Sequence, residues 1–217
     1  MTDAAGMLGD AQVVRGDIGR KLNNALTLSF AVGEDSTIAT AEQGGGDGRG
    51  KKLGTLFGFK NGGPGRHLIT ATSGATLMVE SREQQPTLFT VAGAPCGTAD
   101  RGATSVVRDA DGATVFTVAA HPDGATTVDA FRMLLFDASG APLGSLDVVR
   151  SLAGWTLGTE LVEQAIWFGR AGQPLKAQVL GTMLSFGRPP TALEGDLALG
   201  VCVDCAIGLR PYITEMQ

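Results

Sequence analysis

The feature that most constrains this chain is an apolar stretch at 197–209, in which Asp204 is the only charged residue. Thr191 and Glu194 precede it with the spacing of a capping box, directly after a Pro-Pro pair through which a helix cannot run. We therefore expect a helix from about residue 192 to 207 that is apolar on most of its circumference. Such a helix is normally enclosed, either by protein or by lipid.

The apolar stretch is too short to cross a bilayer as a helix, because it spans roughly 20 Å against a hydrocarbon layer of ~30 Å. A protein core is the better environment for it, and we expect no transmembrane segment. The N-terminal residues carry Asp3 where a signal peptide needs a basic region followed by an apolar run. We therefore expect a cytoplasmic protein.

Composition narrows the class of protein further. With 217 residues, 43% of them hydrophobic, the chain can bury a sizeable core in one domain. A formal net charge of −5 argues against nucleic-acid binding, which relies on clustered Lys and Arg. Three cysteines do not suggest a disulfide framework, and 32 glycines are typical of many tight turns between short strands.

Two parts of the chain differ in pattern. Residues 1–24 lack a clear period, and we expect a loosely ordered N-terminal segment with one short strand at Gln12–Arg15. Residues 25–217 form the expected domain. It begins with a strand at Leu26–Val32, which has high β-propensity and alternation. Strand character returns at Leu53–Lys60, after a glycine-rich loop.

From His67 onward a pattern repeats, in which two short apolar runs flank a turn that ends in glycine. The turn glycines are Gly74, Gly93, Gly112, Gly140 and Gly172. In Asp109–Gly112 and Asp137–Gly140 the aspartate can accept local hydrogen bonds and the glycine tolerates positive φ, which is hairpin chemistry. Five consecutive hairpins predict an antiparallel meander.

These patterns predict a mainly β fold. Between Leu26 and Phe186 the one candidate for an amphipathic helix is 159–165, so about ten to twelve strands precede the buried helix. A sheet that long tends to curl and close, and closure around the helix would remove the sheet edges. We predict a closed antiparallel β-barrel of about 12 strands that encloses the C-terminal helix. A β-sandwich with a packed helix is the alternative.

This arrangement resembles the tubby C-terminal-like superfamily, which includes tubby, phospholipid scramblase and LURP-one-related proteins. The likeness is carried by the hairpins at 108–118 and 136–146 and by the closing helix at 194–204, and it covers about residues 26–213. It implies a twelve-stranded barrel around a hydrophobic helix, and a non-enzymatic binding or scaffold module. Tubby proteins bind phosphoinositides, but no stretch here matches their binding motif.

A local basic patch stands out on this acidic chain. It consists of Arg49, Lys51, Lys52, Lys60 and Arg66. Near an anionic membrane each such residue contributes ~1 kcal/mol, so the patch is our candidate for binding anionic lipid or phosphate at the membrane periphery. Binding of a protein partner by the module is the second option. The interpretation without a binding role is a solvated loop that its charges keep soluble.

Part of the same segment, Gly45 to Lys52, nearly matches the sequence motif of a phosphate-binding P-loop. Lys52 stands where Ser or Thr must hold magnesium, and the flanking residues supply neither the strand nor the helix that the motif requires. We therefore expect no nucleotide and no other cofactor.

Cys202 and Cys205 form a Cys-x-x-Cys pair, which we interpret as buried and inert because it lies within the apolar helix. Zinc would need two more ligands, and Cys96, His67 and His121 have no paired spacing, so no metal is expected. No catalytic motif is evident, and we assign no catalytic residue. An enzyme that acts on a small molecule or lipid through a site on unassigned loops is the alternative function.

The helix carries a narrow stripe of small and acidic residues every four positions. They are Asp196, Gly200, Asp204 and Gly208. We expect this stripe to face a place where backbone approaches closely. Asp204 should have a hydrogen-bonding or basic partner, with Arg210 as one candidate, because an unpaired carboxylate is costly in a core and is opposed by the dipole near a helix C-terminus.

Overall fold

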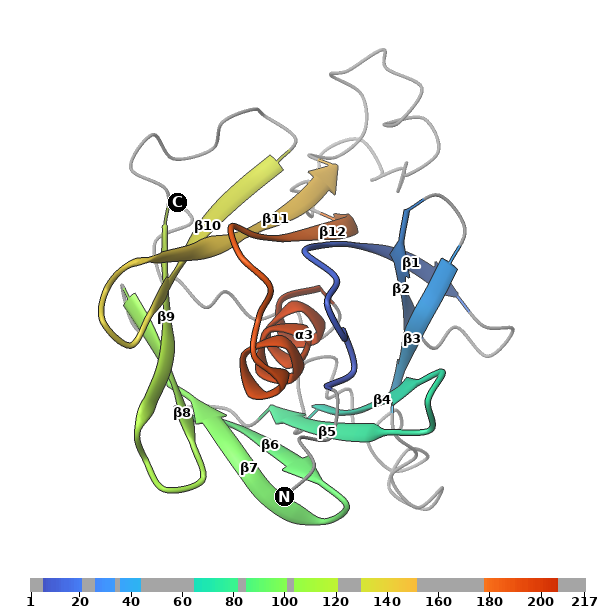
Figure 1. Cartoon of the computed structure of the whole chain (residues 1–217). Coiled ribbons are helices and arrows are strands. Elements are labelled where there is room, and N and C mark those ends of the chain that lie inside the picture. The colour runs from blue at the N-terminus through green and yellow to red at the C-terminus, as the bar shows by residue number, and fades with distance from the viewer. Residues whose placement is uncertain are drawn as a thin grey trace, which may run out of the picture.

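Twelve antiparallel strands close into a barrel around one helix (Figure 1). The structure is a computed structural model, and it describes residues 6–20, 26–33, 36–43, 65–81, 85–100, 104–120, 130–151 and 178–206. The helix is α3 (Ala192–Ala206), and it lies inside the barrel. This confirms the predicted closed β-barrel of about 12 strands with an enclosed C-terminal helix.

Each strand pairs with its neighbours in sequence, and β1 pairs with β12 to close the barrel. The strands are β1 (Val13–Arg20), β2 (Leu26–Val32), β3 (Ser36–Gln43), β4 (Gly65–Ala71), β5 (Thr76–Ser81), β6 (Thr87–Val91), β7 (Ala94–Ala99), β8 (Thr104–Asp109), β9 (Thr114–Ala120), β10 (Ala130–Asp137), β11 (Pro142–Ser151) and β12 (Gln178–Phe186). The predicted strand at Leu26–Val32 is β2 itself. The predicted strand at Leu53–Lys60 lies outside the described residues.

Four of the predicted hairpins are present, and their turns have the expected chemistry. They join β4 to β5, β6 to β7, β8 to β9 and β10 to β11. Their turn glycines have φ between 83° and 86°, a region that favours glycine. In the β10–β11 turn the Asp137 carboxylate accepts hydrogen bonds from the backbone N–H groups of Ser139 (2.9 Å) and Ala141 (3.0 Å). The fifth predicted turn, at Gly172, lies outside the described residues.

The N-terminal segment differs from the expectation of a loosely held entry. β1 is longer than the strand predicted at Gln12–Arg15, and it has a partner on each side, β12 and β2. Before it, Met7 and Leu8 are buried. Closure of the barrel explains the difference, because pairing on both sides and burial stabilise a strand whose local alternation is weak.

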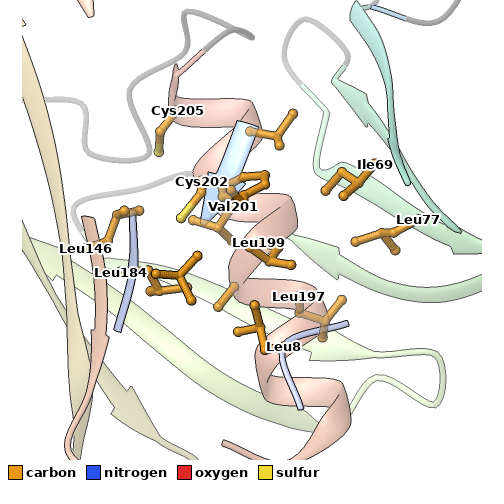
Figure 2. Close-up of a cluster of buried hydrophobic side chains, with 14 of the residues drawn as sticks. Leu8, Ile69, Leu77, Leu146, Leu184, Leu197, Leu199, Val201, Cys202 and Cys205 are labelled. Atoms are coloured by element: carbon orange, nitrogen blue, oxygen red, sulfur yellow. The ribbon is translucent and has the colours of Figure 1, made fainter. Parts of the chain in front are cut away.

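The interior of the barrel is occupied by side chains of the helix and of the wall. Leu197, Leu199, Val201 and Cys202 of α3 are all 0% exposed (Figure 2). Inward-facing wall residues surround them, among them Leu28, Phe30, Ile69, Leu77, Phe89, Phe116, Leu146 and Leu184. Because wall side chains surround the helix on all sides, it needs no polar face. Each large apolar side chain buried in this way contributes roughly 1.5–3 kcal/mol.

The two ends of the barrel differ in how the strands are joined. We call the end where α3 begins the helix-start rim, and its strand connections include the four tight hairpin turns. The opposite end, where α3 ends, is the helix-end rim. Its strand ends are joined by residues 21–25, 44–64, 82–84, 101–103, 121–129 and 152–177, which lie outside the described residues.

Candidate functional site

A cluster of buried polar side chains lies at the helix-end rim, inside an otherwise apolar interior. At its centre is Asp204, which is 0% exposed in the last turns of α3. Thr87 Oγ1 donates a hydrogen bond to Asp204 Oδ2 at 2.6 Å, and Ser81 Oγ donates one to Asp204 Oδ1. These bonds confirm the predicted hydrogen-bonding partner for Asp204. The other candidate partner, Arg210, lies outside the described residues.

The two hydroxyl donors come from adjacent strand ends. Ser81 is the last residue of β5 and Thr87 is the first residue of β6, and both are buried. Ser81 continues the inward-facing series of Leu77 and Val79, since side chains alternate along a strand. Sequence reasoning did not find either hydroxyl. The sequence signal for these two hydroxyl donors is a small polar residue in place of an apolar one, at an inward-facing position at the end of a strand.

His67 is the titratable neighbour of Asp204 in this cluster. It lies on the inward face of β4 with Ile69 and Ala71, and it is 4% exposed. Its Nδ1 atom is buried and has no hydrogen-bond partner in the described part of the chain. Burial lowers the pKa of His67 below its usual value, and the negative charge of Asp204 offsets only part of this effect.

The small-and-acidic stripe of α3 faces β5 and β6, but Gly200 does not meet backbone there. A Cβ atom added at Gly200 would lie 2.5 Å from Cε1 of the Phe89 ring, so an aromatic side chain occupies the place that the prediction gave to backbone. At Asp196 backbone does approach, because Met7 N–H donates to Oδ1 at 2.7 Å. Gly208 lies outside the described residues.

The beginning of α3 is fixed by the predicted capping box. Thr191 N–H donates to Glu194 Oε2 at 2.7 Å, and Glu194 N–H donates to Thr191 Oγ1 at 3.3 Å. Arg188 adds a two-pronged ion pair to Glu194, at 2.8 Å from Nη1 and 2.7 Å from Nη2. The Arg188 guanidinium, and then the Thr191 hydrogen bonds, lower the pKa of Glu194 despite its burial.

Of the five basic candidates, the structure describes one. Arg66 lies at the helix-end rim in β4, and its Nε donates to Glu80 Oε2 of β5 at 3.1 Å. The Arg66 side chain is 58% exposed. Arg49, Lys51, Lys52 and Lys60 lie outside the described residues, within the connection 44–64.

The described barrel wall neutralises several of its own cations. Three further ion pairs join Arg15 to Asp17, Arg108 to Asp100 and Arg132 to Asp147. The last has two short contacts, from Arg132 Nε to Asp147 Oδ1 at 2.7 Å and from Nη2 to Oδ2 at 2.9 Å. Ion pairs at the surface contribute little to stability. Because each of these cations is paired with a carboxylate, the wall has no strong electrostatic field at those positions.

The Cys-x-x-Cys pair lies in the core of the barrel, as we inferred from the sequence. Cys202 and Cys205 are both buried. Burial raises the pKa of the Cys202 thiol, so the reactive thiolate is disfavoured. Cys96, on β7, is half-buried, and its pKa is raised to about 11 by burial and by Asp196. Within the described ranges no group of three or more His, Cys, Asp and Glu side chains could hold a metal ion.

The cluster around Asp204 does not have the arrangement of a nucleophile activated by a base. In such a site the histidine takes the proton of the serine and the aspartate orients the histidine. Here Ser81 donates directly to Asp204, and both are almost fully buried. This geometry holds a carboxylate in a mostly apolar interior and fixes the end of the helix to two strands.

A scan against protein-family models and searches of curated proteins and of solved structures found no match for the chain. The class is therefore set by the fold and its core alone: a closed twelve-stranded antiparallel barrel with a C-terminal helix in its interior. Among the residues that the structure describes, no helix combines the length and the apolar character that crossing a membrane requires.

Proposed function

We propose that this chain is a non-enzymatic binding module of the tubby-like or scramblase-like type, which contacts anionic lipid at its helix-end rim. The barrel serves as a rigid scaffold in this proposal, and the basic segment 49–66 supplies the contact with lipid. The fold supports the proposal because it agrees with the architecture that the sequence resemblance implies.

The observation that carries the proposal is the occupation of the barrel interior by α3. An eight-stranded barrel can hold a small ligand, and larger barrels enclose a lumen. Here Leu197, Leu199 and Val203 take that space, each with no exposed surface. A ligand of this protein is therefore expected on the outside of the barrel or at a rim, where a large flat partner such as a membrane surface can be reached.

The distribution of charge favours the helix-end rim. All five lysines belong to connections whose strand ends lie at that rim, and they are Lys21, Lys51, Lys52, Lys60 and Lys176. The helix-start rim has acidic residues in its hairpin turns, such as Asp109, Asp111 and Asp137. An anionic surface would attract the first rim and repel the second.

Vesicle co-sedimentation tests the proposal, with neutral vesicles compared against vesicles that contain phosphatidylserine. We expect binding to the anionic vesicles only, and weaker binding at high salt because exposed charges are screened. A variant with Lys51, Lys52 and Lys60 changed to Gln should lose about 3 kcal/mol of attraction, which is roughly a hundredfold in partitioning.

The matched control changes Arg15, Arg108 and Arg132 to Gln, which alters the net charge by the same amount on the barrel wall. This control should retain binding to within a few-fold. Equal binding to neutral and anionic vesicles, or an equal loss in both variants, contradicts the lipid-binding rim. No binding to either vesicle would leave a protein partner as the occupant of the module.

A further inference from the structure

His67 is a buried base that the proposed function does not use. It lies in the wall of the barrel at the helix-end rim, with its side chain directed inward beside the polar cluster. Its Nδ1 atom makes no hydrogen bond to any described residue. A neutral imidazole tolerates this position, but an imidazolium carries two N–H donors that both need acceptors or water.

The charged groups around His67 differ on the two faces of the wall. On the inner face the described charged group is Asp204 of α3, whose carboxylate is bound by Ser81 and Thr87. In the strand register His67 pairs with Val79 of β5 and with Gln43 of β3, and neither residue type titrates. Arg66 and Glu80 form their ion pair at alternate positions of β4 and β5, which face outward.

We propose that His67 is the trigger of an acid-sensitive latch, in which its protonation releases the last turn of α3 from Ser81 and Thr87 and opens the helix-end rim. Solvating the imidazolium requires water to reach the inner face of β4, and in the closed barrel α3 occupies the interior that the barrel wall encloses. Opening therefore separates Asp204 from its two hydroxyl donors. This latch does not depend on lipid binding.

The direction of the effect follows from proton linkage. In the closed barrel burial lowers the pKa of His67, whereas in the opened state the imidazole has its usual value of about 6.5. Acid therefore favours the opened state, which binds the proton more readily. Between pH 7.5 and 5.5 the ratio of opened to closed molecules is expected to rise up to about tenfold, as long as the closed form stays neutral.

Hydrogen exchange measured by mass spectrometry tests the latch, with rates corrected for the intrinsic pH dependence of exchange. In the full chain, peptides that cover the second half of α3 should exchange up to about tenfold faster at pH 5.5 than at pH 7.5. Peptides that cover the β8–β9 hairpin serve as the internal reference and should change less. His67→Gln, which keeps a polar side chain but does not titrate, should abolish the difference.

The chain offers a matched control because it has two histidines. His121→Gln should retain the full pH response of α3. An unchanged response in His67→Gln contradicts the latch. Should that variant fail to fold, an NMR titration of the unmodified chain decides, with the two histidine signals assigned from His121→Gln: titration of His67 at or above pH 6.5 would overturn the proposal.

Discussion

Thr87 Oγ1 lies 2.6 Å from Asp204 Oδ2, and this hydrogen bond joins β6 to the end of α3 across 117 residues of sequence. With the Ser81 bond it makes the polar cluster the point where the core helix is fixed in register within an apolar interior. Apolar contacts alone are non-directional and would tolerate small shifts along the helix axis. A buried carboxylate with two hydroxyl donors does not tolerate such shifts, because a shift would leave it without its hydrogen bonds.

The first prediction concerns Thr87. Thr87→Val keeps the shape of the side chain and removes one donor to a buried carboxylate, so the free energy of unfolding should fall by about 1.5–3 kcal/mol. Urea unfolding with an unchanged m-value measures the effect. Thr70→Val, on the exposed face of β4, is the control and should change stability by less than ~0.5 kcal/mol. Equal values for the two variants would show that the bond is dispensable.

Replacing threonine by valine should have the opposite effect on stability at Thr182. Its hydroxyl oxygen is buried on β12 and has no hydrogen-bond partner in the described residues. Thr182→Val removes this unpaired polar atom with little change in volume, so we expect stability to rise by about 1 kcal/mol. Thermal unfolding should show a higher midpoint. A clear loss of stability would mean that the hydroxyl is satisfied, for example by a bound water.

Gly200 and Gly195 both lie within α3, but their surroundings differ. A Cβ at Gly200 would meet the Phe89 ring at 2.5 Å, whereas at Gly195 the nearest atom is Cδ1 of Leu8 at 3.2 Å. Alanine gains ~1 kcal/mol of helix propensity at either site. Gly200→Ala should nevertheless destabilise by about 1–3 kcal/mol through overpacking, and Gly195→Ala should be close to neutral.

Phe89→Leu provides the internal check for the overpacking argument. If the ring causes the clash, adding Phe89→Leu to Gly200→Ala should cost less than the two single effects combined. Chemical denaturation of the four proteins of this cycle measures the coupling. If the two single effects on stability simply add, contact with Phe89 is not the cause of any Gly200→Ala effect.

The capping box predicts a defined pH window. Arg188 lowers the pKa of Glu194 in the folded chain below its usual value of 4.5, so the stabilisation is present above about pH 4.5 and is lost as pH falls through the folded value. Glu194→Gln should therefore cost ~1 kcal/mol at neutral pH, and its difference from the unmodified chain should shrink in acid. Guanidinium unfolding at several pH values measures this. A difference that is constant with pH would exclude the charged pair as its source.

Local chemistry explains what the sequence could predict. Thr191 and Glu194 are three residues apart, and each hairpin turn is built from four or five consecutive residues, so their bonds depend on nothing distant. Asp204 could be assigned a partner because burial of a lone carboxylate is costly in any protein. The extent of β1 could not be predicted, since Gly16 and Gly19 weaken its local β-propensity.

The polar cluster shows where prediction from a single sequence stops. Ser81 lies 123 residues from Asp204, and the identity of the donor depends on which strand end the closed barrel brings beside the helix. In the sequence, His67 begins the first of the apolar runs that flank the turn glycines. Its position beside Asp204 follows from the strand order and register, which no local pattern near either residue contains.

The order of elements along the chain has a consequence for biosynthesis. α3 follows β12, and β1 is paired with β12, so the strands emerge from the ribosome before the helix that fills the space between them. Until α3 appears, the inward faces of Phe30, Phe89 and Phe116 have no core to pack on. The barrel therefore cannot complete its core until α3 has been synthesised, and before that point the inward faces of the strands expose apolar surface.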